Sequence, residues 1–528
     1  MPSGSGRNSG QKHCVKRIAS LCCVHMTLNP VGDEEEKSGP RHFTRGLGLF
    51  DSSMIVIGIM VGSGIFIVPA EMARLIASPG WLLVAWAVTG VLTVTAGLTY
   101  GELAAMMPEA GGMYVYLREA FSPLIGFLYG WTLWTVIQTG TIAAVAIAFA
   151  RFAGVLMPSI ADNHYLIAPV HVFGNYFVSL STTQLLAIAI VVLLTFANSL
   201  GLNYGRILQN IFTVAKIGAL VALVALGCTI GIHHAAVMEN FHHFWSVRHP
   251  VSFAKGMDAS TGLGMFLAIC IAQSGSLFAA DAWHDITFVA AEVKNPARNL
   301  PLALGIGTSS VIVLYLLANL AYLCTLPLSA IQHAPFDRVA TAALQSIYPY
   351  AGAALMAIAI MVSTFGTVNA MTLAGARVFY AMAHDGLFFR RAGRLNRANV
   401  PGWGLAIQGI WTAFLVLPRT WNPITQQYGN LYSNLLDYVI SAALLFYILA
   451  IAGVIRLRIK RPDANRPYRV WGYPWLPLLY IVGGSVIVVV LFVFRPATTW
   501  PGLAIVATGV PIYAAMRWRN KTSAPRLL

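Results

Sequence analysis

Two short polar stretches inside apolar segments hold the residues best able to do chemistry. The first is Gly62-Ser63-Gly64, three residues that helices dislike or merely tolerate, placed within a run of apolar side chains. In a membrane, an interrupted helix is tolerated only where its backbone is buried in protein or lines a cavity. This stretch is therefore a candidate binding site for a polar ligand.

The second stretch, at 274–285, brings two acids and a histidine into another apolar run. Asp281 could attract a cationic side chain, carry a coupling proton, or cap the N–H groups of the helical segment that follows. His284 and Asp285 could extend a proton relay or be satisfied interior groups, and Trp283 is a further candidate contact. The residues themselves leave these alternatives open.

No constellation for catalysis is visible elsewhere in the sequence. The pairs His233-His234 and His242-His243 lack acidic or cysteine ligands at helical spacing, which argues against a metal site. An enzyme would need a nucleophile, a base or metal ligands that converge near one face. We therefore predict no enzymatic reaction, no metal and no cofactor.

Composition indicates a membrane protein. Hydrophobic residues make up 57% of the 528 residues, charged residues only 10%, and the mean hydropathy is +0.69. Apolar runs of about twenty residues predict an all-α polytopic fold with twelve transmembrane helices. These lie near 52–76, 80–107, 123–151, 182–200, 206–231, 260–291, 301–326, 349–383, 402–418, 431–455, 474–494 and 499–516.

The net charge of +15 is unevenly distributed between alternate loops. Basic residues crowd into the N-terminal tail, the loops after the eighth and tenth predicted helices, and the C-terminal tail. The positive-inside rule then predicts that both termini lie in the cytoplasm. We expect the protein to be located in the cell membrane, that is, the inner or plasma membrane. Nucleic-acid binding would need these charges on one folded surface with elements that read bases, and no such element is visible.

The two polar stretches are five predicted helices apart, which suggests an internal duplication. An odd number of helices in each repeat inverts the second copy across the membrane, and broken helices at matching positions point to a transporter binding site. We expect repeats at 46–231 and 260–455, accessory helices at 474–516, a disordered cytoplasmic tail at 1–45 and a second tail at 517–528.

Several motifs resemble those of the amino acid-polyamine-organocation (APC) transporter superfamily, and the chain most resembles its L-type amino acid transporter branch. They occur in the expected order and together cover about 45–480. They are VGSGIF at 61–66, PEAGGMYVYLREAF at 108–121, AEVKNPARNLP at 291–301, RVFYAMAHDG at 377–386 and RPYRVWGYP at 466–474. The resemblance implies a LeuT-like fold with broken helices 1 and 6.

The resemblance also implies how a free amino acid would bind. Exposed N–H groups of Gly62, Ser63 and Gly64 would receive the carboxylate, as helix N-termini receive anions. Phe278 would be the aromatic gate that closes over the substrate. Carbonyls left free at the two breaks would receive the ammonium group, namely those of Ile59, Met60, Phe278, Ala279 and Asp281.

Lys216 is the most informative single charge, because an intramembrane lysine needs a partner. In sodium-independent relatives a lysine resembling this one occupies the space of a sodium ion and bridges the first helix to the eighth, where Ser363 or Thr364 could accept its hydrogen bond. Sodium coupling is therefore disfavoured, although the lysine could instead extend toward the cytoplasmic end. Gln138 is expected either to form a hydrogen bond between two helices or to contact the substrate.

These features predict a secondary or exchange transporter of amino acids, with neutral L-amino acids as the expected substrates. Exchange, facilitated diffusion and proton symport all fit the residues. The alternatives are a cationic amino acid or polyamine carrier with proton coupling, because of Asp281, and a nutrient sensor built on a transporter scaffold. No disulfide-linked heavy chain is expected, since the loop at about 152–181 has no cysteine, whereas a non-covalent partner remains compatible with the sequence.

Overall fold

The structure is a computed structural model that describes residues 45–174, 176–253, 256–422, 427–428 and 431–523. These residues belong to one unit, His42–Leu528. The tail predicted at 1–45 lies outside the described residues except for its last position. The second predicted tail is helical as far as Ser523, and the positions after it are not described.

Long apolar helices make up most of the described chain. Ten stretches are long and apolar enough to cross a membrane, and α1 (Leu49–Met60) with α2 (Gly64–Ile76), bent by 42° at the break between them, forms an eleventh. The ten stretches are α3 (Pro79–Met106), the run of α5 (Pro123–Thr132), η1 (Leu133–Ile137) and α6 (Gln138–Leu156), α7 (Thr182–Ser199), α8 (Leu202–Gly227), α10 (Gly262–Ala279) with η2 (Trp283–Glu292), α11 (Pro296–Thr325), α14 (Gly352–His384), α16 (Leu431–Lys460), α17 (Trp475–Phe494) and α18 (Pro496–Ser523).

The predicted helix at 402–418 differs from the other eleven. Here the chain forms α15 (Gly402–Leu415), which has 14 residues and ends before β3 (Pro418–Asn422) begins. At about 1.5 Å per residue, such a helix is shorter than the hydrocarbon core of a bilayer. A multi-pass, all-α membrane fold is thus observed, while the twelfth span remains a prediction.

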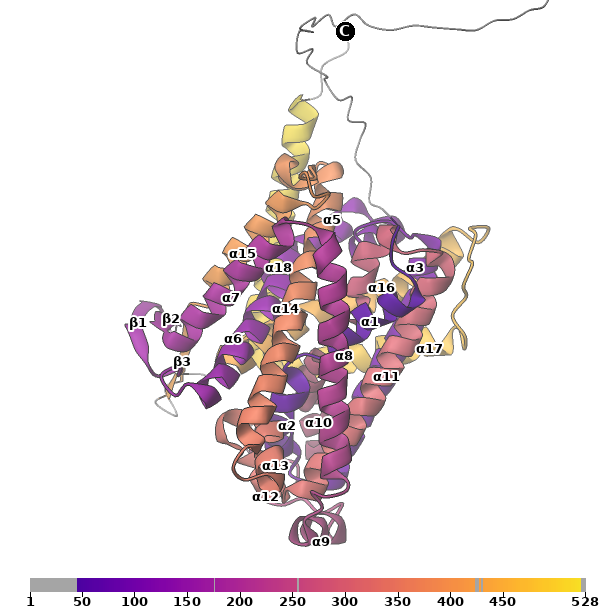
Figure 1. Cartoon of the computed structure of the whole chain (residues 1–528). Coiled ribbons are helices and arrows are strands. Elements are labelled where there is room, and N and C mark those ends of the chain that lie inside the picture. Colours follow the sequence, from indigo (N-terminus) through magenta and orange to yellow (C-terminus); the bar gives the residue numbers. More distant parts are fainter. Residues whose placement is uncertain (1–44, 175, 254–255, 423–426, 429–430, 524–528) are drawn as a thin grey trace, which may run out of the picture. The chain divides into compact units, whose positions relative to one another are not determined.

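A small antiparallel sheet was not predicted. It has the strand order β1-β2-β3-β4 and is built from β1 (Tyr165–Phe173), β2 (Tyr176–Ser181), β3 and β4 (Gln427–Tyr428). Tyr176 of β2 pairs with Thr420 of β3, so the loop after α6 is joined to the loop after α15. The sheet lies beyond the lower ends of α6 and α7 in Figure 1.

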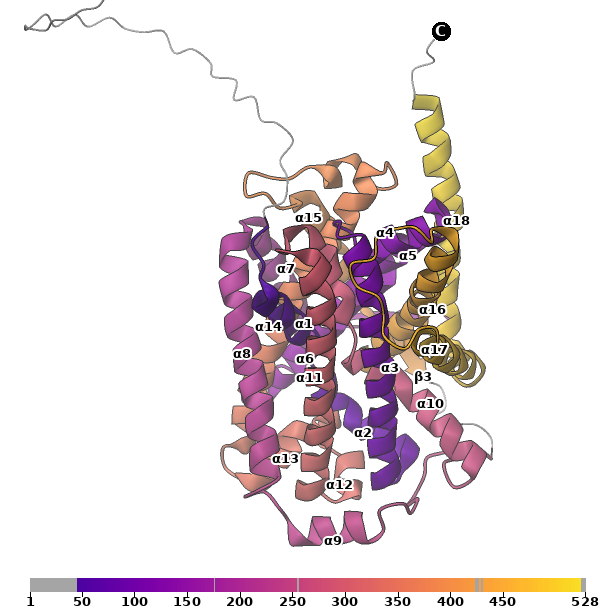
Figure 2. The same ribbon diagram turned by 90° about the vertical axis from the view of Figure 1, so that its right-hand side faces the viewer.

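Short helices mark the two ends of the long ones. In Figure 2, α4 (Met113–Ala120) lies near the upper ends, whereas α9 (His234–His242), α12 (Leu328–Gln332) and α13 (Val339–Ile347) lie at the lower ends. The remaining short elements are η3 (Pro335–Asp337) and η4 (Arg390–Gly393). The terms "upper face" and "lower face" refer to these two ends below.

The packing of the long helices brings the two breaks together. Helix α2 packs against α10, while α1 contacts α8, α11, α14 and η2. On the upper side of the second break, the fully buried guanidinium group of Arg377 on α14 donates a 2.8 Å hydrogen bond to Glu292 at the end of η2. The repeat organisation expected from the sequence remains a prediction.

Candidate functional site

The first break is held open by backbone geometry at 61–63. Helix α1 ends at Met60, α2 begins at Gly64, and the N–H of Gly62 donates to the Met60 carbonyl at 2.8 Å. The Gly62 N–H is therefore not free for a ligand, which corrects one part of the predicted carboxylate site. The N–H groups of Ser63 and Gly64 lie at the start of α2, where a helix has donors without intrahelical acceptors.

Gly64 lies in direct contact with the second break. A Cβ atom at this position would come within 2.5 Å of the Ala279 Cβ and 2.6 Å of its Cα. Any side chain larger than hydrogen would push the start of α2 away from the end of α10. This close approach alone explains why position 64 is a glycine, whether or not the backbone freedom of glycine is also needed there.

Tyr432 connects two of the predicted site residues. Its hydroxyl lies 2.8 Å from the Ser63 Oγ, and its ring meets the Phe278 ring edge-on with centroids 6.2 Å apart. All three side chains are buried. Sequence reasoning missed Tyr432, because an aromatic residue at the start of an apolar helix carries no signal of its own.

The predicted free carbonyls are largely occupied. The Tyr315 hydroxyl of α11 lies 2.9 Å from the Met60 carbonyl and 3.0 Å from the Ala279 carbonyl, and the Phe278 carbonyl accepts from the Asp281 N–H at 3.1 Å. The expectation of free carbonyls at these positions is thus wrong. A carbonyl oxygen has two lone pairs, so the Ala279 carbonyl retains the capacity for a second hydrogen bond, whereas the Met60 carbonyl accepts from both Tyr315 and the Gly62 N–H.

Ile59 contributes to the site through packing. Its side chain is buried in an apolar cluster that also contains Ile142 of α6 and Ala282 from the second break. Gln138, the first residue of α6, donates from Nε2 to the Met371 carbonyl of α14 at 2.8 Å. It follows the π-helical segment η1, an irregularity that frequently occurs at functional sites.

Lys216 of α8 is almost fully buried, with 1% of its surface exposed. Its Nζ donates to the carbonyls of Gly58 and Val61, the latter at 3.1 Å, and to the Thr367 Oγ1 of α14 at 2.9 Å. These three acceptors match the three protons of an ammonium group. The lysine therefore connects the end of α1 to α14.

The acceptor on α14 differs from the predicted one. Ser363 donates its own hydrogen bond to the Val61 carbonyl at 3.1 Å, and Thr364 bonds to the Ile360 carbonyl of its own helix. Thr367 lies one helical turn beyond Ser363, so the two share a face, and it is Thr367 that meets the lysine. The predicted acceptor was wrong by one turn, because the sequence does not determine how far α8 is shifted along α14.

Asp281 contacts a side chain on a different helix. Its Oδ1 accepts from the Tyr447 hydroxyl of α16 at 2.6 Å, a tertiary contact that none of the three sequence interpretations included. Trp283 packs against Tyr100 of α3 and Tyr447, with ring centroids 5.2 Å and 5.9 Å apart. Asp281 and Trp283 thus lie in one buried polar and aromatic cluster.

His284 and Asp285 extend this cluster without satisfying each other. The His284 Nε2 lies 3.4 Å from the Tyr129 hydroxyl of α5 and 3.6 Å from the Asp285 Oδ1. Both side chains are buried, and neither the His284 Nδ1 nor the Asp285 Oδ2 has a hydrogen-bond partner in the described structure. Buried polar atoms without partners are costly, so they mark places where a ligand group, water or proton can bind.

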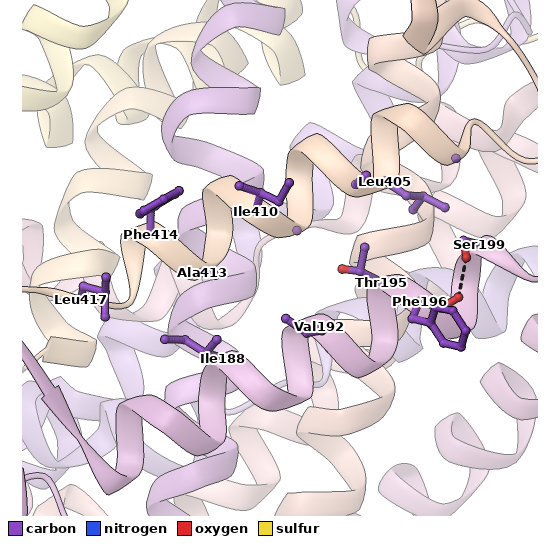
Figure 3. A pocket seen from close by; sticks show the side chains of 13 residues that line it. Ile188, Val192, Thr195, Phe196, Ser199, Leu405, Ile410, Ala413, Phe414 and Leu417 are labelled. Atoms are coloured by element: carbon purple, nitrogen blue, oxygen red, sulfur yellow. Dashed lines mark hydrogen bonds between the residues drawn. The ribbon is translucent and has the colours of Figure 1, made fainter. Parts of the chain in front are cut away.

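A groove lies apart from these residues, between α7 and α15 (Figure 3). It has a volume of about 620 Å³ and is lined mainly by apolar side chains such as Ile188, Val192 and Phe414. The Ser199 hydroxyl at one end donates to the Phe196 carbonyl of its own helix. None of the predicted site residues lines this groove. Among the described residues, no group of three histidine, cysteine or acidic side chains is placed to hold a metal.

Known proteins resemble this chain over most of its length. The Amino acid permease family matches residues 47–516. The b(0,+)-type amino acid transporter 1 of Mus musculus is 27% identical over 452 residues, covering 85% of this chain and 83% of its own length. The Large neutral amino acids transporter small subunit 2 of Rattus norvegicus is 28% identical over 499 residues, covering 93% and 85% respectively.

A third relative, the Asc-type amino acid transporter 1 of Mus musculus, is 28% identical over 477 residues, which cover 90% of this chain and 82% of its own length. The family match spans both breaks, the buried lysine and the acidic cluster. This protein therefore belongs to the amino acid permease family of multi-pass membrane transporters and is not an enzyme.

Proposed function

We propose that this protein carries amino acids across the cell membrane by alternating access, with its upper face and both termini in the cytoplasm. The observation that carries the proposal is the direct contact between the two helix breaks at Gly64 and Ala279. Interrupted helices that meet in the interior of a transporter form its substrate site. The repeats at 46–231 and 260–455 and a twelfth span formed by α15 are part of this proposal.

The two ends of an amino acid fit the groups at the breaks. The carboxylate would accept hydrogen bonds from the N–H groups of Ser63 and Gly64, which the dipole of α2 makes favourable for an anion. The ammonium group would bind the second lone pair of the Ala279 carbonyl, which has the Tyr315 hydroxyl on its first. Phe278, held edge-on by Tyr432, would cover the bound substrate.

Lys216 supports transport without sodium. A sodium ion would need the oxygens at the end of α1 and on α14, and the lysine ammonium already occupies three of them. A second positive charge there would be repelled strongly in the membrane interior. We therefore infer that the lysine takes the place of a coupling cation.

Neutral L-amino acids are the proposed substrates, and exchange is the proposed mode. The substrate class is supported by the names of relatives, one of which is a transporter of large neutral amino acids, and the exchange mode is a proposal that the uptake experiment tests. For this chain we propose transport without a disulfide-linked partner, since residues 152–181 contain no cysteine.

Uptake into proteoliposomes tests the proposal. Radiolabelled neutral and cationic amino acids would be supplied outside, with or without internal amino acid, a proton gradient and sodium. Neutral uptake that requires internal amino acid, and not sodium, is the expected result. Sodium dependence would contradict the role of Lys216, and substrate binding without any flux would favour the nutrient sensor.

A carrier of cationic amino acids is the second candidate, and the buried Asp281 favours it. The carboxylate lies three residues after Phe278 and has Tyr447 as its hydrogen-bond partner. A lysine or arginine side chain could pair with the same carboxylate. If cationic amino acids are the substrates, Asp281→Asn will reduce their uptake by at least about tenfold, because a charged hydrogen bond is worth about 1.5–3 kcal/mol, while neutral uptake changes little. Competition between labelled leucine and lysine measures this ratio.

A further inference from the structure

Three guanidinium groups from separate segments lie in the neighbourhood of Asp162 at the lower face. Arg151, near the end of α6, donates to the Asp162 Oδ2 from Nε at 3.0 Å and from Nη2 at 2.7 Å. Arg419 of β3 donates to the Asp162 backbone carbonyl at 2.7 Å. Arg338 precedes α13, and its Nη2 lies 4.0 Å from the position that a Cβ on Gly154 of α6 would occupy. We call Arg151, Arg338 and Arg419 the arginine cluster.

The positive charge of this cluster exceeds the negative charge beside it. Asp162 pairs with Arg151, while Asp337, the chain neighbour of Arg338, forms an ion pair with Arg74 at 2.7 Å. The Arg338 guanidinium carbon lies 4.8 Å from the centre of the Phe336 ring and 5.9 Å from that of the Phe152 ring. Among the described contacts, Arg338 forms no ion pair with a carboxylate.

Burial makes this excess charge significant. Arg151 and Arg419 expose only 7% and 6% of their surface, and the Nε atoms of Arg338 and Arg419 are buried without a hydrogen-bond partner in the described structure. Burial and the nearby charge of Arg151 lower the pKa of Arg338 to about 10, although Asp162 acts in the opposite direction. Buried cations without counter-charges are costly, and an anion would remove that cost.

The cluster lies close to the proposed substrate site. Arg151 is near enough to Tyr432 for its charge to act on that hydroxyl, which contacts the Ser63 Oγ at 2.8 Å. In the proposed orientation, the cluster is on the outer side of the first break.

We propose that Arg338 and Arg419 form an outer binding site for a monovalent anion, and that its ligand is the carboxylate of the amino acid before that group reaches Ser63 and Gly64. A guanidinium group suits this task, because its planar donors bind both carboxylate oxygens at once. Its positive charge also raises the local concentration of an anionic group. The inference depends on the proposed transport function and on the outward placement of the lower face.

Kinetics of uptake from the two sides of the membrane test this site. Arg338→Gln and Arg419→Gln should each raise the KM for external amino acid about tenfold, in line with the loss of a charged hydrogen bond, and leave kcat unchanged. The KM for internal amino acid during efflux should stay the same. Arg338→Lys should recover part of the external affinity, because it restores the charge without the planar geometry.

A matched control is available at the lower face. Arg248 pairs with Glu239 at 3.2 Å and so has its own counter-charge. Arg248→Gln should leave both KM values unchanged, and size-exclusion chromatography would check that every variant is folded. An unchanged external KM in folded Arg338→Gln and Arg419→Gln would overturn the proposal.

Chloride has the same single negative charge as a carboxylate, so the experiment must distinguish chloride from the amino acid carboxylate as the ligand of this site. The wild-type KM would be measured with external chloride and again with the chloride salt replaced by sucrose, which is uncharged and does not compete for an anion site. An unchanged KM supports the amino acid carboxylate as the ligand, whereas uptake that requires chloride would overturn that assignment. Absence of transport by the wild type would instead reject the proposed function.

Discussion

Two buried polar clusters lie at the two helix breaks, and they differ in how completely their polar atoms are hydrogen-bonded. Lys216 has three oxygen acceptors for its three protons, from the end of α1 and from α14. By contrast, the cluster of Asp281, His284 and Asp285 retains two buried polar atoms without partners. A saturated cluster fixes the relative positions of helices, whereas an unsaturated one keeps the capacity to bind.

The largest expected effect comes from removing the saturated charge. Lys216→Ala removes the three charged hydrogen bonds that join the end of α1 to α14, and we expect uptake to fall by at least about a hundredfold, since hydrogen bonds of charged groups are worth about 1.5–3 kcal/mol each. Uptake and size-exclusion chromatography of the purified variant measure this. Lys294→Ala, at an exposed position, is the control, and undiminished uptake by Lys216→Ala would refute the coupling role.

The contact between the breaks should be the next most sensitive feature. Gly64→Ala places a Cβ within 2.5 Å of the Ala279 Cβ, so overpacking should cost about 1–3 kcal/mol and reduce uptake about tenfold. Gly218→Ala is the matched control, because a Cβ there meets nothing within 4 Å. Thermal unfolding and uptake of both variants would be compared, and equal behaviour would argue against a tight contact between the breaks.

An effect no larger than that of Gly64→Ala should separate Thr367 from its neighbour Thr364. Thr367→Val removes one acceptor from Lys216 but keeps the volume, and we expect uptake to fall about tenfold for a charge-assisted hydrogen bond of about 1.5 kcal/mol. Thr364→Val, which loses only a bond to its own helix, should be close to wild type. Equal losses in the two variants would mean that the contact with Lys216 is unimportant.

The smallest effect is expected in the unsaturated cluster. Asp285→Asn removes a buried carboxylate that has His284 as its nearest ion-pair partner at 3.6 Å. Because an ionised carboxylate in this place is poorly compensated, the melting temperature should be unchanged or higher. A clear loss of thermal stability would show that Asp285 is as well satisfied as Lys216, and the contrast between the clusters would then disappear.

Much of the site could be predicted from the local sequence. The predictions that were wrong were those that depended on contacts between residues far apart in the sequence. The break at Gly62 and Ser63 was predicted because helix-disfavouring residues stood inside an apolar run. The roles of Tyr315, Tyr432 and Tyr447 were missed, since a tyrosine in an apolar helix looks like ordinary packing until its partner is known. The prediction that the Met60 and Ala279 carbonyls would be free was wrong for the same reason, because their contact with Tyr315 was not foreseen.

The fold shows the same division between local and distant information. Eleven of the predicted spans correspond to helices long and apolar enough to cross a membrane, counting α1 and α2 as one. The four-stranded sheet was not foreseen, because its strands come from loops that are far apart in sequence. Strand pairing of this kind depends on where the flanking helices end.

The sequence by itself determined the membrane class, the positions of both breaks and the presence of a buried lysine, because these depend on hydrophobicity and helix propensity along a continuous stretch. Only the tertiary structure decided which oxygens Lys216 meets, that Thr367 replaces Ser363 as its acceptor, and that Arg151 and Arg419 both bond to Asp162. The physical reason is that hydrogen bonds and ion pairs have a short range, so a shift of one helical turn between two helices changes every partner.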